Sequence, residues 1–122
     1  ITDVDDYDDP NVVKVISDKD DKAIYFSRAG IPWRQHLIKD HINNYPAYRH
    51  IGMYAYRAGF LKIFAKLAPS LIEMAESLEQ LRAIFHGYSI QVDRACAESG
   101  MSIDTEDDLQ IARKRPSEID TQ

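Results

Sequence analysis

Two short runs rich in β-branched and aromatic residues lie close together near the start of the chain, at residues 11–16 and 23–28. The stretch between them, residues 17–22, is polar and rich in turn-forming residues. Runs of this kind bounded by polar turn residues favour strands. The pattern therefore predicts a β-hairpin, followed after Gly30 and Pro32 by an irregular loop that reaches Pro46.

Residues 50–57 show a period of two. One face would hold His50, Gly52, Tyr54 and Tyr56, and the other Ile51, Met53 and Ala55. Because successive side chains of a strand point to opposite faces, the alternation predicts a third strand.

The period then changes to that of helices. Phe60, Phe64 and Leu67 are spaced for an amphipathic helix that ends near Pro69. Ser70 and Glu73 form a capping-box pattern that predicts a second helix reaching Gly87. Its expected apolar stripe consists of Leu71, Met74, Leu78, Leu81 and Phe85.

The rest of the chain predicts a short strand at residues 89–92 and a last helix capped by Thr105. That helix begins with acidic residues and ends with basic ones, which suits the helix dipole. A strand hairpin and three helices in this order indicate an α/β layered fold.

Residues 1–10 are strongly acidic and look too polar to bury anything, and residue 1 is isoleucine. We interpret them as an acidic linker at a cut inside a longer chain. Residues 11–115 then form the folded unit, and residues 116–122 form a polar tail.

Composition excludes several classes of protein. The 122 residues are 44% hydrophobic and 29% charged, enough for one small domain. The net charge of -5 and the scattered basic residues argue against a nucleic-acid partner. Neither an apolar run of about 18 residues nor a signal-peptide pattern is present, so we expect no membrane insertion and a cytoplasmic location. Cys96 is the single cysteine, which excludes an internal disulfide.

Candidate chemistry begins on the predicted strands. Arg28 could pair bidentately with a ligand carboxylate, or could simply extend its charge into solvent. His50 and Tyr54, with Gly52 between them, could form a surface for sugar hydroxyls, although a satisfied core histidine is the plainer alternative.

Glu79 and Gln80 lie beside the apolar stripe of the second predicted helix and could bind hydroxyl groups. The alternative is a solvated flank in which Glu79 pairs with Arg82. Asp104 precedes the last predicted helix and could hold Mg²⁺ against phosphates or act as a cap. The motifs of zinc peptidases, serine hydrolases, P-loop and Rossmann proteins are absent from the sequence.

Taken in order, several segments resemble the 3-deoxy-manno-octulosonate (Kdo) cytidylyltransferase family. The segments are Pro-Asn-Val-Val-Lys-Val at 10–15, Tyr-Phe-Ser-Arg at 25–28 with Ile-Pro at 31–32, His-Ile-Gly-Met-Tyr-Ala-Tyr-Arg at 50–57, Glu-Ser-Leu-Glu-Gln-Leu-Arg at 76–82 and Ile-Asp-Thr at 103–105. The resemblance implies the C-terminal half of a nucleotide-diphospho-sugar-transferase-like, Rossmann-like fold with a mixed sheet.

The resemblance also implies a reaction in which the anomeric hydroxyl of Kdo attacks the α-phosphate of CTP. CMP-Kdo for lipopolysaccharide assembly and pyrophosphate are the products. Magnesium is the implied cofactor, with Asp104 as its ligand, and a homodimer is the implied assembly. The implied sugar-acid contacts are Arg28, His50, Tyr54, Glu79 and Gln80.

Departures from the family pattern leave alternatives open. Trp33-Arg34-Gln35 stands where the family has an aromatic residue followed by Asp-Arg, and Glu106 replaces a proline. The substrate could therefore be another sugar acid, such as 8-amino-Kdo or a sialic-type acid. The family's CTP loop has no equivalent in these 122 residues, so we expect this chain alone to be inactive. A non-catalytic sugar-acid-binding or dimerisation module is the third alternative.

Overall fold

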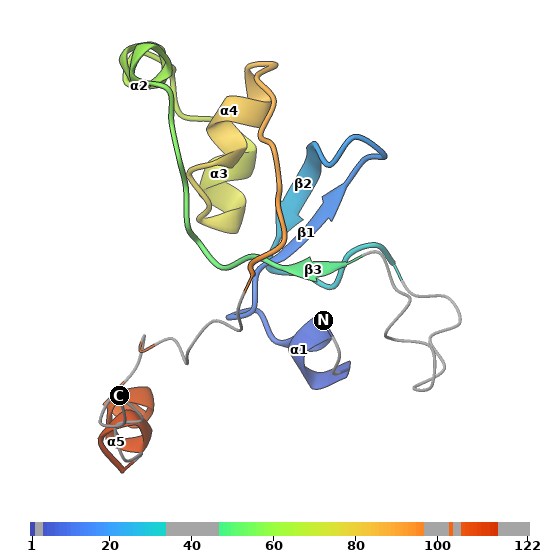
Figure 1. The fold of residues 1–122 in the computed structure, drawn as a ribbon, viewed down its shortest axis with the longest axis vertical. Coiled ribbons are helices and arrows are strands. Elements are labelled where there is room, and N and C mark those ends of the chain that lie inside the picture. Colours follow the sequence, from blue (N-terminus) through green and yellow to red (C-terminus); the bar gives the residue numbers. More distant parts are fainter. Residues whose placement is uncertain (2–3, 34–46, 97–102, 104–105, 115–122) are drawn as a thin grey trace.

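The computed structural model describes residues 1, 4–33, 47–96, 103 and 106–114. The elements are α1 (Val4–Asp8), β1 (Lys14–Ser17), β2 (Ala23–Ser27), β3 (Tyr48–Arg49), α2 (Ala58–Phe64), α3 (Leu71–Glu76), α4 (Leu81–Phe85) and α5 (Glu106–Lys114). Figure 1 shows the strands beside the α3 and α4 pair, with α2 beyond that pair and α5 apart from the sheet.

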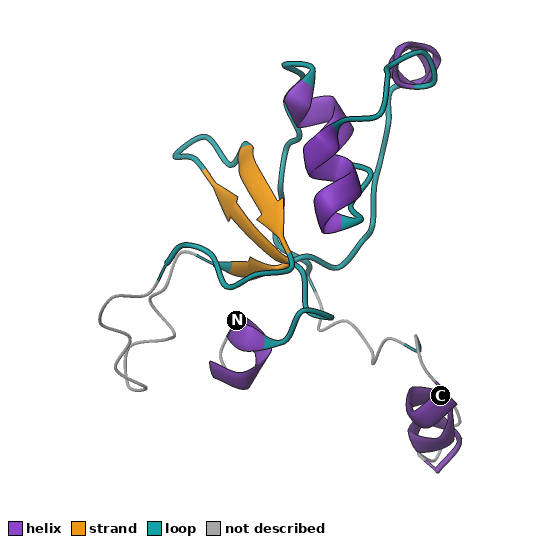
Figure 2. Cartoon of the chain, turned by 180° about the vertical axis from the view of Figure 1, so that it is seen from behind, coloured by secondary structure: helices purple, strands orange, loops and turns teal. Residues whose placement is uncertain are grey.

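The three described strands form one antiparallel sheet in the order β2-β1-β3. The predicted hairpin is confirmed: β1 pairs with β2, and Asp18 organises the turn by accepting bonds from the backbone N–H groups of Asp20 (2.8 Å) and Lys22 (2.9 Å). An aspartate that binds the backbone two residues on is a common turn device. The α/β class is confirmed, and Figure 2 shows the sheet and helix layer from behind.

The third strand predicted at residues 50–57 is wrong. The strand β3 consists of the two preceding residues, Tyr48 and Arg49, and residues 50–57 are assigned to no strand or helix. Gly52 has a φ of +81°, a left-handed conformation that breaks the regular alternation of an extended chain. We call residues 50–57 the strap.

The single helix predicted from Ser70 to Gly87 is also wrong, because the chain forms α3 and α4 with a break between them. Ser77 has φ 53° and ψ 48°, which ends α3 in a left-handed residue. The capping box of Ser70 and Glu73 is confirmed, and Gly87 has the expected positive φ of 83°.

This break changes which side chains face the core. Leu78 and Leu81 are buried, but Leu71 is 78% exposed. Met74 and Phe85 are exposed as well. The left-handed residue rotates α4 relative to α3, so the predicted stripe does not continue across the break.

The core lies between the sheet and the helix pair. Val15, Phe26, Leu78 and Leu81 form its buried cluster, joining β1 and β2 to the start of α4. Around it pack the partly buried residues Val13, Ala23, Tyr25, Ile72, Ile84, Ile90 and Val92. Burial of aliphatic and aromatic side chains is the main stabilising contribution in such a layer.

The expectation that residues 1–10 bury nothing is wrong. Residues 4–8 form α1, and the Tyr7 side chain is 2% exposed. Its hydroxyl donates to the carbonyl of Pro32, and a Cβ on Gly30 would overlap the Tyr7 ring. The ring therefore requires a glycine at position 30, and this contact attaches α1 to the loop after β2.

The helix predicted to end near Pro69 is confirmed as α2, which ends at Phe64, whereas the strand predicted at residues 89–92 is wrong. Phe60, Phe64 and Leu67 are the less exposed positions in and after α2, as the helical spacing predicts. The segment 89–92 lies beside the start of β2 through a bridge between Lys22 and Gln91, but it is not assigned as a strand. The last helix is α5, whereas Thr105 and the predicted tail lie outside the described residues.

No helix in the described part of the chain is long and apolar enough to span a membrane.

Candidate functional site

Arg28 and His50 lie in one row across the sheet. Lys14 pairs with Ser27 on one side and with Arg49 on the other, so the next position brings Arg28, Val13 and His50 into line. The backbone N–H of His50 donates to the carbonyl of Val13 at 2.9 Å, which confirms this register. Because adjacent strands are about 4.8 Å apart, the two backbones are about 10 Å apart, a spacing suited to a small ligand.

This row faces the helix pair. Phe26 precedes Arg28 by two residues and therefore lies on the same face of β2. Its ring is in the buried cluster with Leu78 and Leu81, and it meets the His50 ring edge-on at 5.1 Å between centroids. Glu79 and Gln80 immediately precede α4. This end of α4 therefore packs on the face of the sheet on which Arg28 and His50 lie.

His50 and Tyr54 form a hydrogen-bonded pair. Their Nε2 and hydroxyl oxygen are 2.7 Å apart, and their ring centroids are 5.3 Å apart. Burial lowers the pKa of His50, so the neutral ring is favoured. Burial, and to a lesser degree the neighbouring Tyr56, raises the pKa of Tyr54. A neutral imidazole beside a phenol offers both donors and acceptors, as recognition of hydroxyl groups requires.

The aromatic contacts continue along the strap. Tyr54 stacks on Tyr56 at 5.9 Å, Tyr56 on Phe60 at 6.2 Å, and Phe60 meets Tyr88 edge-on at 5.2 Å. The sequence placed His50, Tyr54 and Tyr56 on one face, and the ring contacts bear this out although no strand forms.

Arg28 is held by neutral acceptors. Its Nε donates to the carbonyl of Glu76 at 2.8 Å, and one terminal nitrogen donates to the carbonyl of Pro10 at 3.1 Å. Among the described residues its guanidinium has no carboxylate partner, and the side chain is half-buried. The fixed fork can therefore receive a carboxylate from outside.

Gln80 and Glu79 differ in environment. Gln80 is 8% exposed, and its Nε2 has no hydrogen-bond partner within the described structure. A buried amide donor without a partner is costly, so it indicates a missing acceptor.

Glu79 is exposed, and it does not form the pair with Arg82 that the alternative interpretation expected. The partner of Arg82 is Glu73 on α3, which Arg82 Nε reaches at 2.9 Å.

Asp104, the predicted metal ligand, lies outside the described residues. Within the described part of the chain, no group of three or more His, Cys, Asp or Glu side chains is placed to hold a metal ion.

Sequence reasoning missed two residues that organise this region. The Glu76 carboxylate accepts from Ser27 Oγ at 2.7 Å and from the backbone N–H of Arg28 at 2.9 Å. The buried Lys14 ammonium donates to the carbonyls of Asp9, Val12 and Arg28 at 2.6–2.7 Å. The only sign of the role of Lys14 in the sequence is its position within a run of β-branched residues.

The sheet register and the helix pair bring three features to one face of an α/β layer: the Arg28 guanidinium, the His50–Tyr54 pair and the Gln80 amide. Among the described residues the guanidinium has no carboxylate partner and the amide nitrogen has no acceptor. Such a set suits a small acidic ligand rich in hydroxyl groups. A profile of the cytidylyltransferase family matches residues 1–92, well over half of the chain, and the chain belongs to this family.

Individual relatives agree with this. The chain is 51% identical over 118 residues to the 3-deoxy-manno-octulosonate cytidylyltransferase of Idiomarina loihiensis, covering 93% of this chain and 47% of that protein. The corresponding protein of Francisella tularensis subsp. holarctica is 47% identical over 115 residues, covering 93% of this chain and 46% of the relative. The chain thus spans about half the length of the curated relatives it matches.

A solved structure of CMP:2-keto-3-deoxy-manno-octonic acid synthetase complexed with CTP superimposes with a TM-score of 0.78 at 33% identity. The match covers 91% of this chain and 44% of that one. The family resemblance and the fold predicted from the sequence are therefore confirmed.

Proposed function

We propose that the full-length protein transfers CMP from CTP to Kdo and releases pyrophosphate, supplying CMP-Kdo for lipopolysaccharide assembly. The principal support is the 51% identity over 118 residues to a protein named for this reaction. The site is compatible with it, because an arginine fork and hydroxyl-binding groups share one face of the layer.

Within this proposal each side chain has a defined task. Arg28 binds the carboxylate of the sugar acid, because two of its nitrogens are held by backbone carbonyls and its guanidinium has no carboxylate partner among the described residues. His50 and Tyr54 bind hydroxyl groups through their paired polar atoms. Gln80 supplies its unpartnered amide, and Glu79 accepts from a further hydroxyl. Together they orient the anomeric hydroxyl for attack on the α-phosphate of CTP.

The assignment of Arg28, His50, Tyr54, Glu79 and Gln80 as sugar contacts is tested most directly with His50→Ala and Glu79→Ala in the full-length protein. Both variants should raise KM for the sugar acid more than KM for CTP, measured by pyrophosphate release. Lys19→Ala, on the exposed hairpin turn, is the control and should leave both constants unchanged. Unchanged kinetics for the sugar acid in both site variants would remove these residues from the site.

The sugar acid is tested with a substrate panel. Full-length protein is incubated with CTP and, separately, Kdo, 8-amino-Kdo or a sialic acid, and pyrophosphate is measured. The proposal expects the highest kcat/KM with Kdo. A higher kcat/KM with another acid would identify that acid as the substrate in place of Kdo. If no acid led to pyrophosphate release, the proposed activity would be wrong.

We propose Mg²⁺ as the cofactor, with Asp104 as a ligand. A carboxylate is the hard oxygen donor that Mg²⁺ prefers, and Mg²⁺ commonly uses one or two carboxylates together with substrate phosphates. When bound, it would neutralise charge on the phosphates of CTP. Asp104→Asn should keep the melting temperature but lose most turnover, with partial recovery at raised Mg²⁺. If Asp104→Asn kept wild-type turnover at ordinary Mg²⁺ concentrations, Asp104 would not be a metal ligand and would act only as a helix cap.

We also propose a homodimer in the cytoplasm. No residue of α2 is buried, and Leu61 and Ile63 are exposed, so this helix has apolar surface to cover. Sedimentation of the full-length protein should give a dimer, and Ile63→Glu should shift it toward monomer. A wild-type monomer at micromolar concentration would contradict the assembly, and cell fractionation checks the compartment.

A further inference from the structure

Glu76, the last residue of α3, joins that helix to the end of β2. Its carboxylate accepts from Ser27 Oγ at 2.7 Å and from the Arg28 backbone N–H at 2.9 Å. Its backbone carbonyl accepts from Arg28 Nε at 2.8 Å. One residue of α3 thus holds both the main chain and the side chain of Arg28, which is 48 positions away in sequence.

These bonds satisfy an open sheet edge. β2 is an edge strand of the described sheet; at its start the Ala23 N–H donates to the Ile90 carbonyl, whereas no described strand lies along its outer edge at Arg28. Glu76 supplies the acceptor at Arg28. Burial, and then the charge of Glu76, raises the pKa of Tyr25. The carboxylate is therefore used by β2 and is not available to pair with the Arg28 guanidinium.

The arrangement determines how Arg28 is presented. Its Nε and one terminal nitrogen are bound to carbonyls, which restricts rotation of the guanidinium without neutralising its charge. An oriented, unneutralised fork is the form that binds a carboxylate bidentately.

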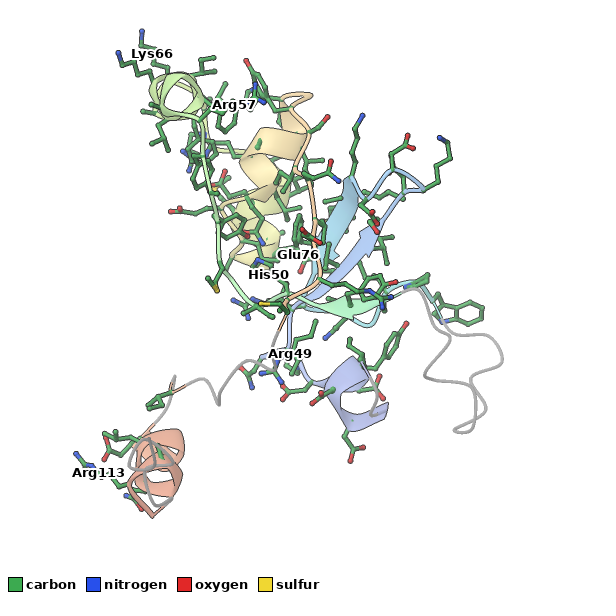
Figure 3. All side chains as sticks on the ribbon, viewed as in Figure 1. Arg49, His50, Arg57, Lys66, Glu76 and Arg113 are labelled. Atoms are coloured by element: carbon green, nitrogen blue, oxygen red, sulfur yellow. The ribbon has the colours of Figure 1, made fainter. Side chains whose placement is uncertain are left out.

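Glu76 also lies next to the second group of predicted contacts. Ser77 turns the chain immediately after it, and Glu79 and Gln80 follow within four residues. In Figure 3 the labelled Glu76 and His50 lie where the helix pair approaches the strands. Any shift of Glu76 against β2 would therefore change the distance between Arg28 and the Glu79–Gln80 turn.

We propose that Glu76 is a positioning residue: it fixes the Arg28 fork relative to the Glu79–Gln80 turn, so that both can bind one sugar acid. This inference rests on the proposed function. Glu76 touches neither substrate; it acts through Arg28.

The test is Glu76→Gln in the full-length protein. Glutamine has nearly the size of glutamate, but it has one accepting oxygen where the carboxylate has two. It therefore cannot accept from both Ser27 Oγ and the Arg28 N–H as the carboxylate does, and Arg28 is held less firmly. KM for Kdo should rise about tenfold or more, since misplacement by about an ångström can cost a hundredfold, while KM for CTP stays within about twofold. The dissociation constant for CTP, measured directly, shows that the variant is folded.

Glu73→Gln is the matched control. Glu73 is also on α3 and is buried, but its carboxylate bonds Arg82 and the Ser70 N–H, not β2. This variant should lower the melting temperature without a selective rise in KM for Kdo. Glu76→Ala, which removes both oxygens, should be worse than Glu76→Gln in KM for Kdo.

The outcomes separate the two proposals. If wild-type protein transfers CMP to no sugar acid, the proposed function fails and the positioning role fails with it. If wild-type protein is active but Glu76→Gln changes the two KM values equally, or resembles Glu73→Gln, only the positioning role is wrong.

Discussion

At the scale of single residues, Lys14 shows how a charge can be buried in a small sheet. Its side chain is fully buried, and its ammonium donates to three backbone carbonyls from the α1–β1 turn and the end of β2. Burial lowers the pKa of Lys14, and the acidic residues Asp9, Asp8 and Asp6 oppose that shift. The lysine thereby connects three backbone segments.

We expect Lys14→Met to destabilise the full-length protein by about 2–4 kcal/mol, because it leaves those buried acceptors unpaired. Urea denaturation provides the measurement. Lys19→Met, at an exposed lysine of the same hairpin, should change stability by less than about 0.5 kcal/mol. Equal, small effects in both variants would show that the carbonyls find other partners.

His50 should make stability depend on pH in the mildly acidic range. Its pKa is lowered by burial below the ordinary value of 6.5, so the unfolded chain binds the proton more readily than the folded one. Stability contributed by His50 is therefore complete above pH 6.5 and decreases as pH falls from 6.5 to the folded pKa. Urea midpoints at pH 7.5 and 5.5 should differ less in His50→Gln than in the wild type; an identical pH dependence would contradict the assignment.

The sequence predicted the grouping of His50 with Tyr54 but not the environment of Gln80. The grouping was predicted from period-two spacing, but Gly52 breaks that alternation, and the Tyr54 hydroxyl lies 2.7 Å from His50 Nε2 without a regular strand. The second depends on where α4 begins. A glutamine that looks like a solvated flank of one long helix becomes buried once the helix is broken before it.

At the scale of elements, the break at Ser77 is the feature that no local pattern revealed. The hairpin and the capping box were predicted because turn residues and caps have short-range signatures. The stretch Glu76-Ser77-Leu78-Glu79 contains neither glycine nor proline, so nothing in it signals a left-handed residue. Tertiary bonds of Glu76 to β2 and burial of Leu78 and Leu81 favour the break instead.

This break can be tested by substitution at Ser77, which is exposed and makes no core contact that a larger side chain would disturb. A β-branched residue is strained at φ 53°, whereas glycine is not. Ser77→Val should therefore be about 1–2 kcal/mol less stable than Ser77→Gly in the full-length protein. The same pair of changes at Ser89, which is exposed and does not have a positive φ, should show no such penalty for valine.

At the scale of the whole molecule, apolar side chains are exposed over the strap and the helices. Met53 is 87% exposed, and Leu61, Leu71 and Phe85 are also largely uncovered. Extended apolar surface of this kind usually marks an interface. The chain spans about half the length of its curated relatives, and we expect this surface to be covered by protein equivalent to the other half of those relatives or by a second subunit.

Catalysis should therefore require more than these 122 residues. The predicted sugar contacts lie in this chain, whereas the family resemblance assigns the CTP loop to a part of the relatives that has no counterpart here. We expect the isolated chain to release no pyrophosphate from CTP and Kdo, and to bind an apolar dye more strongly than the full-length protein does. The full-length protein assayed beside it controls for substrate quality. Turnover by the isolated chain at a rate near that of the full-length protein would mean that these residues contain a complete nucleotide site.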